Sequence, residues 1–342
     1  MIEDSHALLF TISMCACGSE TEMTTSERIR QMVVALGCVV YYLLLMTPYC
    51  WLKNIYKLFV PDPPKSVKGE IVLITGTGHG MGRLLAEKYA KEGATVVGWD
   101  INDVNNETTL LGIRKLGFTK VYGYKCDISN REEVLRVAKK VQKEVGDVTI
   151  LINNAGIMPS HLFLEHTEQE IRNIMEINVM GHFWTLQAFL PTMRKNNRGH
   201  VVCLSSMAGQ VGCINLVPYN ASKFAVRGLM EGLYEEFRHY PNNKVKFTTI
   251  YPFLVDTGLC KNYEISLDLI TPMAKAQDVV EGIFKAQSQG IQHQLLPAEM
   301  TLHIHFLTKF LPQEVVDHMR SFLKADLKSD KDLVNNGTKK NM

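Results

Sequence analysis

Beyond residue 68 the chain alternates short apolar runs with longer stretches in which apolar residues recur at helical spacing. Short apolar runs bounded by turn residues are typical of buried strands, and the amphipathic stretches between them predict helices. Such alternation produces a parallel sheet with helices on both faces, so an α/β, doubly wound parallel sheet is predicted over residues 68–300. The expected strands are 69–75, 94–100, 121–127, 148–154, 200–206 and 245–251, with 290–297 as a candidate seventh, and the expected helices include 129–145, 167–194 and 218–239.

A different pattern precedes this region, because no residue from Gln31 to Leu52 is charged. About 20 helical residues span the ~30 Å hydrocarbon layer of a bilayer, so residues 31–52 predict a membrane anchor helix after a disordered arm over residues 1–30. A buried core helix is the alternative, but such a helix ordinarily carries a polar stripe. Pro48 would kink or end the helix, which leaves a transmembrane span and a monotopic insertion both open.

The flanks of this run bear on its orientation. Residues 53–67 form a Pro-containing linker with three lysines and are followed by Lys68, against Arg28 and Arg30 on the other side. The positive-inside tendency therefore predicts that the larger part of the chain faces the cytosol, at the endoplasmic reticulum membrane or a lipid droplet. Residues 301–342 are expected to form a C-terminal helical segment and a disordered tail.

Composition excludes some functions. The 342 residues carry a net charge of +2, which gives no signal for nucleic-acid binding. The eight cysteines are scattered without a CxxC or Cys/His cluster, so neither a metal site nor a disulfide framework is predicted.

A glycine-rich turn, Thr75-Gly-Thr-Gly-His-Gly-Met-Gly82, follows the first expected strand and opens a helix. Glycines let a backbone approach a pyrophosphate, which the N–H groups of a helix N-terminus attract. Asp100 closes the next strand, where a carboxylate can accept hydrogen bonds from a ribose and repel a 2′-phosphate. The pattern predicts a Rossmann-type dinucleotide site that prefers NAD; His79 and Arg83 keep NADP as the alternative.

Tyr219 and Lys223 stand four residues apart in an expected helix and so share one face. A neighbouring ammonium favours the phenolate, which brings a tyrosine with an ordinary pKa of about 10 towards neutral pH. Tyr49–Lys53 and Tyr240–Lys244 have the same spacing, so the pair alone is weak evidence. Only Tyr219 has a serine, Ser206, thirteen residues upstream after an apolar strand.

Taken together, these motifs resemble the short-chain dehydrogenase/reductase family over residues 68–290. The family's TGxxxGxG pattern is met by Thr75, Gly76, Gly80 and Gly82 with Met81 inside it, and its NNAG signature by Asn153, Asn154, Ala155 and Gly156. The family's acid after the third strand matches Asp127, which is followed by Ile128. Its catalytic Asn, Ser, Tyr and Lys match Asn178, Ser206, Tyr219 and Lys223. The Thr that contacts the nicotinamide in the family matches Thr257.

One departure is Phe253, which stands where the family usually has Gly after Pro252. The extra side chain would narrow the pocket or only change the loop. The anchor and this loop are similar to a membrane-bound branch that contains epidermal retinol dehydrogenase 2 and lipid-droplet 17-beta-hydroxysteroid dehydrogenases.

The resemblance implies a role for each residue. Tyr219 takes the hydroxyl proton while a hydride passes to the nicotinamide, and Ser206 holds the substrate oxygen. Lys223 lowers the Tyr219 pKa and binds the nicotinamide ribose. Asn178 holds a water that links Lys223 to solvent. Ser205 is an equally good hydroxyl apart from its spacing. Asn178 has the alternative of merely cross-linking helices.

We therefore expect an NAD-dependent oxidoreductase that interconverts a lipophilic alcohol, retinoid- or steroid-like, and its carbonyl compound. Its partners would be that substrate and membrane lipid, with a possible homodimer through 167–194 and 218–239. An NADP-dependent carbonyl reductase is the alternative enzyme, and a non-catalytic membrane scaffold is the alternative class. Residues 300–322 fit a pocket cap, a membrane-surface helix or core packing.

Overall fold

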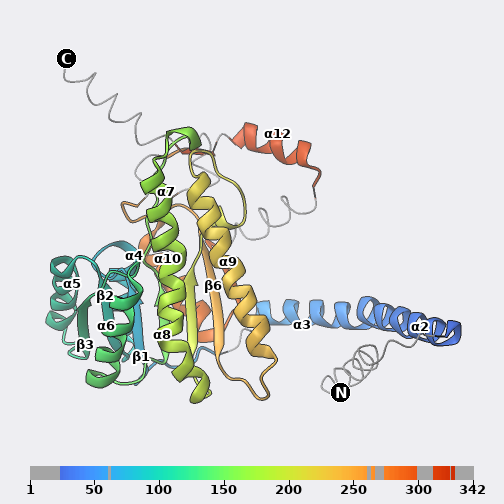
Figure 1. Ribbon diagram of the computed structural model, residues 1–342, viewed down its shortest axis with the longest axis horizontal. Coiled ribbons are helices and arrows are strands. Elements are labelled where there is room, and N and C mark those ends of the chain that lie inside the picture. The colour runs from blue at the N-terminus through green and yellow to red at the C-terminus, as the bar shows by residue number, and fades with distance from the viewer. Residues whose placement is uncertain are drawn as a thin grey trace. The chain divides into compact units, whose positions relative to one another are not determined.

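A computed structural model of the chain describes residues 24–60, 63–259, 263–265, 273–298, 311–323 and 325–327 (Figure 1). It divides into two units, Met1–Pro63 and Pro64–Met342. Residues 1–23 of the expected arm and residues 328–342 of the expected tail lie outside the described residues.

The first unit is one long helix made of α2 (Thr25–Tyr41), a π-helical turn η1 (Tyr42–Met46) and α3 (Thr47–Phe59). It begins earlier than predicted because Thr24 and Glu27 form a capping box, in which each side chain accepts the other residue's backbone N–H. It also continues past Leu52. The predicted arm and linker were therefore wrong over residues 25–30 and 53–59, which are helical.

Pro48 does not end this helix. A proline lacks an N–H and its ring clashes with the carbonyl four residues earlier. The wide turn η1 changes the pairing just before it, so that the Thr47 N–H and hydroxyl both donate to the Tyr42 carbonyl, the hydroxyl at 2.8 Å. The stretch Thr25–Lys57 is long and apolar enough to cross a membrane, and none of its most apolar window is buried.

The second unit is built on a seven-stranded sheet in the order β10-β6-β5-β4-β1-β2-β3, with every neighbouring pair parallel. The Rossmann-type fold predicted from the sequence is confirmed. The strands are β1 (Ile71–Thr75), β2 (Thr95–Asp100), β3 (Val121–Lys125), β4 (Ile150–Asn153), β5 (His200–Leu204), β6 (Lys246–Pro252) and β10 (His293–Leu296).

Helices cover both faces of this sheet. Alternate strand residues point to opposite faces, and both sets are apolar, so two separate cores form. On one face pack α4 (Gly80–Lys91), α5 (Asp103–Lys115) and α10 (Ala276–Gln289); on the other pack α6 (Arg131–Glu144), α8 (Gly181–Lys195) and α9 (Val217–Arg238).

The helix predicted over 167–194 is interrupted. The structure has α7 (Glu168–Met175), a π-helical turn η3 (Glu176–Met180) and then α8. Asn178 lies inside the π turn and is fully buried. Such turns widen the backbone locally and often mark functional sites.

Smaller elements surround the end of the sheet at which the strands terminate. They include the 3-10 helices η2 (Phe163–Glu165) and η4 (Met207–Gly209) and two short sheets, in which β7 (Val255–Asp256) pairs with β9 (Ala274–Lys275) and β8 (Tyr263–Ile265) with β11 (Ala325–Leu327). Towards the C-terminus α12 (Gln313–Leu323) overlaps the segment 300–322, for which a pocket cap, a membrane-surface helix and core packing all stay predictions.

Candidate active site

Two neighbouring pockets lie where the strands end, one beside β1 and β2 and the other beside β5 and β6. They share the lining residues Met81, Asn154, Gly156, Thr257 and Leu259, so they form one continuous cleft. The strand order reverses between β1 and β4, and ligands of open α/β sheets bind at that point. We call the two parts the nucleotide pocket and the catalytic pocket.

The glycine-rich turn forms the floor of the nucleotide pocket. Gly76 and Gly80 have φ angles of +76° and +56°, which favour glycine. At Gly82 an added Cβ would lie 1.9 Å from the Gly76 carbonyl oxygen, so α4 approaches the turn too closely for any side chain. The turn and the first N–H groups of α4 therefore remain open to a phosphate.

Thr75 supports the turn from behind and does not line either pocket. Its buried hydroxyl accepts hydrogen bonds from the backbone N–H groups of Asn154 and Ala155, at 3.0 and 3.1 Å. The Asn154 side chain donates in return to the Thr75 carbonyl at 2.8 Å. These bonds lock the end of β1 to the end of β4, across the point where a dinucleotide would cross the sheet.

Asp100 lies at the end of β2 and lines the nucleotide pocket. One carboxylate oxygen accepts the Gly78 N–H and the other accepts the Asn102 N–H, both at 2.8 Å. These two bonds fix the carboxylate beside the glycine-rich turn. Each oxygen retains a lone pair with which it can accept from a ribose hydroxyl.

A buried pair behind this carboxylate was missed by sequence reasoning. The Thr77 hydroxyl donates to Asn106 Oδ1 at 2.6 Å, and Asn106 Nδ2 donates to the Gly98 carbonyl at 3.0 Å. Both side chains are fully buried. Asn106 therefore ties α5 and β2 to the glycine-rich turn, and a polar residue on the apolar side of α5 was the signal that could have found it.

Asp127 and Ile128 complete the far wall of the nucleotide pocket. Asp127 Oδ1 accepts from the backbone N–H and the hydroxyl of Ser129, at 2.9 and 2.7 Å. Ile128 packs against Gly181, where an added Cβ would lie 2.8 Å from its Cδ1. Both residues therefore line the nucleotide pocket, and their contact with an adenine stays a prediction.

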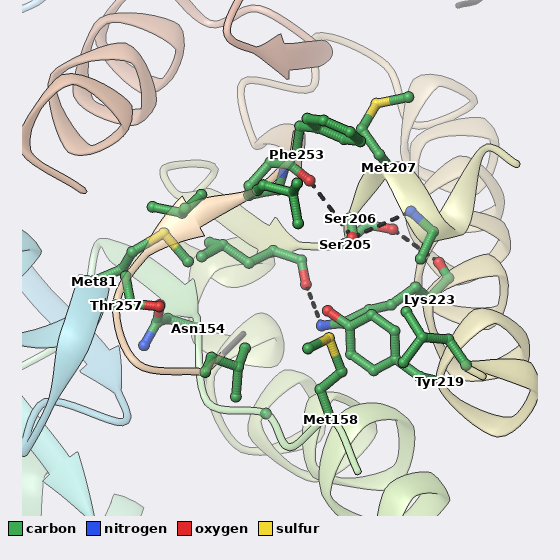
Figure 2. Close-up of a pocket in the computed structure, with 18 residues that line it drawn as sticks. Met81, Asn154, Met158, Ser205, Ser206, Met207, Tyr219, Lys223, Phe253 and Thr257 are labelled. Carbon is green, nitrogen blue, oxygen red and sulfur yellow. Dashed lines mark hydrogen bonds between the residues drawn. The ribbon is translucent and has the colours of Figure 1, made fainter. Parts of the chain in front are cut away.

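Tyr219 and Lys223 lie on α9 and line the catalytic pocket (Figure 2). The Lys223 ammonium lies 5.5 Å from the centre of the Tyr219 ring and donates to the Leu204 carbonyl at 2.9 Å. Burial lowers the pKa of Lys223 to about 8. The ammonium is therefore held by the backbone of β5 within one helical turn of the phenol.

The two other Tyr–Lys pairs lack this setting. Tyr240 lies beyond the end of α9, and its ring faces the Arg194 guanidinium at 4.0 Å. Tyr49 lies on α3 and is exposed. Neither lines the described pockets.

The structure distinguishes the two candidate serines. The Ser205 hydroxyl is buried and donates to the Lys223 carbonyl at 2.9 Å, which ties β5 to α9. Both serines line the catalytic pocket, but Ser206 is the less buried: its hydroxyl accepts the Ala208 N–H at 3.2 Å and donates to the Pro252 carbonyl at a long 3.5 Å. The Ser206 hydroxyl is therefore the better placed of the two to meet a substrate oxygen.

Asn178 lies behind the cleft rather than in its lining. Its Oδ1 accepts the Ile157 N–H at 2.9 Å, while Nδ2 donates to the Ile157 carbonyl at 2.9 Å and to the Ser222 hydroxyl at 3.1 Å. It thus joins the loop after β4 to the residue preceding Lys223. This cross-linking role, considered as the alternative, is present in the structure; the water-holding role stays a prediction.

The remaining walls of the catalytic pocket are mostly apolar, with Asn154 and Thr257 as polar members. Phe253 lines it and packs with Met207, Tyr251 and Leu295, while its N–H donates to the Leu296 carbonyl at 2.9 Å. Its ring therefore narrows the pocket, as one of the two sequence-based interpretations held. Figure 2 shows Phe253 beside Met207, with Tyr219 and Lys223 on one side of the pocket and Met81, Asn154 and Thr257 across from them.

Comparison with known proteins agrees with this geometry. The family described as short chain dehydrogenase matches residues 70–267. Human epidermal retinol dehydrogenase 2 is 42% identical over 253 residues, which are 74% of this chain and 82% of that protein. Human 17-beta-hydroxysteroid dehydrogenase 13 is 39% identical over 271 residues, which are 79% of this chain and 89% of that protein.

Solved structures share the fold. A short-chain dehydrogenase/reductase from Burkholderia phymatum in complex with NAD aligns with a TM-score of 0.64 at 25% identity, covering 77% of this chain and 98% of its own. A gluconate 5-dehydrogenase from Burkholderia cenocepacia in complex with NADP and tartrate aligns with a TM-score of 0.61 at 23% identity, covering 68% and 96%.

Proposed function

Because the chain belongs to the short-chain dehydrogenase family, an NAD(P)-dependent class of oxidoreductases acting on alcohols, we propose that it interconverts a lipophilic alcohol and its carbonyl compound with NAD as cofactor. The relatives named for retinol and hydroxysteroids support a retinoid- or steroid-like substrate.

The observation that carries this proposal is the contrast inside the catalytic pocket. One side holds Ser206, Tyr219 and Lys223, and the other sides are formed mainly by methionine, leucine and phenylalanine side chains, with Asn154 and Thr257 towards the nucleotide pocket. The pocket is open to solvent and has about 790 Å³ of space when its mouth is included. An extended apolar molecule with one hydroxyl or carbonyl oxygen matches that lining.

The side chains can perform the proton transfer. The Tyr219 hydroxyl exchanges a proton with the substrate oxygen, and the Ser206 hydroxyl donates a hydrogen bond to that oxygen as charge develops on it. The Lys223 ammonium stabilises the phenolate form of Tyr219. Asn178 and Ser205 hold α9 in place, so the three reacting side chains keep their spacing.

The nucleotide pocket fits a dinucleotide, because Gly76 and Gly80 line it without a side chain and the close Gly82 contact holds the N-terminus of α4 against this turn. The pyrophosphate would be held by Gly76, Gly80 and Met81, and the adenosine ribose by Asp100. The adenine would contact Asp127 and Ile128. The nicotinamide half would contact Asn154, Ala155 and Thr257. When bound, NAD would supply the hydride acceptor. The fixed Asp100 carboxylate supports NAD over NADP, since it would repel a 2′-phosphate.

We also propose that the helix Thr25–Lys57 anchors the enzyme in the endoplasmic reticulum membrane or on a lipid droplet, with the catalytic unit in the cytosol. An apolar alcohol partitions into lipid, so the anchor raises the substrate concentration beside the pocket. A homodimer through α8 and α9 is proposed from their outward faces, where Phe183, Phe224 and Tyr234 are exposed.

The test is a screen of lipid alcohols and ketones with the full chain in detergent or lipid, with NAD and NADP, read by cofactor absorbance. Tyr219→Phe should lower kcat/KM by at least about 100-fold, because general acid–base groups typically contribute 10²–10⁴. Tyr240→Phe is the matched control and should retain wild-type activity.

Equal activity of Tyr219→Phe and wild type in every assay would sink the enzymatic mechanism. An absence of turnover by the wild type, with intact NAD binding, would instead favour the scaffold. A preference of the wild type for NADP would overturn the cofactor assignment alone.

A further inference from the structure

A second buried side chain lies one turn beyond Asn178 on the same helix. His182 belongs to α8, four residues after Asn178, and residues at that spacing share a helix face. Both side chains are fully buried, at 0% exposure for Asn178 and 1% for His182. Because Asn178 donates to Ser222 of α9, this face points towards the helix that carries Lys223.

The His182 ring has no hydrogen-bond partner among the residues that the structure describes, at either Nδ1 or Nε2. The neighbouring Thr185 hydroxyl lies 3.0 Å from the His182 carbonyl oxygen and 2.9 Å from Asn153 Oδ1, so it pairs with these oxygens and not with the ring. A buried imidazole without partners is costly, and internal water normally satisfies such groups.

Burial and the nearby Lys223 charge lower the pKa of His182 to about 3. The ring is therefore neutral at physiological pH, with one nitrogen that donates and one that accepts. The other titratable groups around Lys223 are Tyr219 on α9 and Cys203 on β5, whose pKa burial raises to about 12. Cys203 is thus a neutral thiol, and His182 is the uncharged acceptor among these groups.

Resting on the function proposed above, we propose that His182 is a positioning residue that holds an internal water molecule against the Lys223 ammonium. The water accepts from the ammonium and donates to the imidazole nitrogen that carries no proton. An ammonium with three N–H donors thereby gains a partner besides the Leu204 carbonyl. His182 acts on the reaction only through Lys223, by favouring its protonated form.

The test compares His182→Phe, which fills the space with an apolar ring, with His182→Asn, which keeps a polar acceptor. Loss of an acceptor for the charged form lowers a lysine pKa. The alkaline limb of the kcat/KM profile of His182→Phe should therefore move down by about one pH unit, the shift that corresponds to one charge-assisted hydrogen bond. His182→Asn should restore most of it.

A second readout needs no turnover. Trace labelling of amines with acetic anhydride across pH, with the Lys223 peptide quantified by mass spectrometry, reports the protonation of Lys223 in the full chain. His200→Phe is the matched control, because His200 is equally buried but is hydrogen-bonded to Thr248 and Gln287. It should leave the Lys223 labelling curve unchanged.

A folded His182→Phe variant whose alkaline limb and Lys223 labelling both match wild type would show that His182 is a core residue and overturn the proposal. If the wild type turns over no alcohol, the proposed function fails, but the labelling curve still decides the role of His182. A labelling shift that His200→Phe reproduces would also overturn it, since the effect would then be general destabilisation.

Discussion

Polar side chains lie at both ends of the parallel sheet, but they are arranged differently. At the end where the strands begin, Tyr89 donates to Gln287 at 3.0 Å, Gln287 contacts His200 at 3.2 Å, and His200 contacts Thr248 at 2.8 Å. Thr248 donates to the Ile291 carbonyl at 2.7 Å. Each donor in this buried chain meets an acceptor, which requires the Nε2–H tautomer of His200.

At the end where the strands terminate, the polar groups line a cleft instead. Asp100 keeps acceptor capacity that faces the nucleotide pocket, and Lys223 is buried with one backbone acceptor. The Ser206 hydroxyl donates to the Pro252 carbonyl at 3.5 Å, a bond long enough for a substrate oxygen in the catalytic pocket to replace it. The first end stabilises the fold by closing every hydrogen bond internally. The second end leaves bonds for ligands, so substitutions at the two ends should separate stability from function.

The largest separation is expected from two glycines. Gly82→Ala places a Cβ 1.9 Å from the Gly76 carbonyl oxygen and should displace the turn. The NAD affinity should then fall by at least about 100-fold, because the displaced backbone N–H groups no longer reach the pyrophosphate oxygens. Gly290→Ala, at the other end, forces a φ of +71° on a residue with a Cβ. It should cost about 1 kcal/mol of stability and leave NAD affinity unchanged.

Fluorescence titration with NADH and thermal unfolding of both variants provide the measurement. Gly82→Ala with normal NADH affinity would contradict the placement of the pyrophosphate beside α4.

A smaller separation is expected from two aspartates. Asp100→Ala removes a charged acceptor for the ribose and should weaken NAD binding about 10–100-fold while it improves NADP binding, because a hydrogen bond to a charged group is worth about 1.5–3 kcal/mol. Asp147, in the loop before β4, accepts from Asn196 at 3.3 Å and is exposed. Asp147→Ala should leave the NAD-to-NADP ratio of Kd values at the wild-type level, and a shift in that ratio would argue against a specific role for Asp100.

The smallest effect concerns pH. Burial lowers the pKa of His200 to about 3, below its ordinary value of 6.5, so the unfolded chain takes up a proton before the folded chain does. Stability is therefore complete above pH 6.5 and falls as the pH decreases towards 3. Between pH 7.5 and 5 this histidine should account for about 2 kcal/mol.

Urea unfolding of the wild type and His200→Phe at the two pH values checks this. The variant should be less stable at pH 7.5, where Gln287 and Thr248 lose a partner, and should depend less on pH. An unchanged pH dependence would show that His200 titrates normally.

Much of the fold was predictable from sequence because the buried strands are apolar on both faces and bounded by turn residues. The π turns, one before Pro48 and one around Asn178, were not predictable. They change the backbone hydrogen bonding of a helix and leave no signal in the spacing of its apolar residues. The ends of the anchor helix depended on the Thr24–Glu27 cap, which is a local side-chain interaction rather than a feature of hydropathy.

The site was predictable where chemistry requires a residue type at a fixed spacing, as for Tyr219 and Lys223. Supporting contacts were not, because Asn106 and His182 come from helices whose relation to the cleft depends on how those helices pack. The direction of each hydroxyl distinguishes Ser205 from Ser206, because adjacent residues in an extended chain point to opposite faces. Which of the two faces meets the cleft is known only from the structure.

The entry point of the chain into the catalytic unit has a consequence for how such enzymes can be rearranged. The Lys65 N–H donates to the Ser288 carbonyl at 3.0 Å and Val67 is buried, so the incoming chain is fixed where the strands begin. The cleft lies where they terminate. The segment before Pro64 can therefore be exchanged for another N-terminal segment, or for a fusion partner, without displacing a cleft residue.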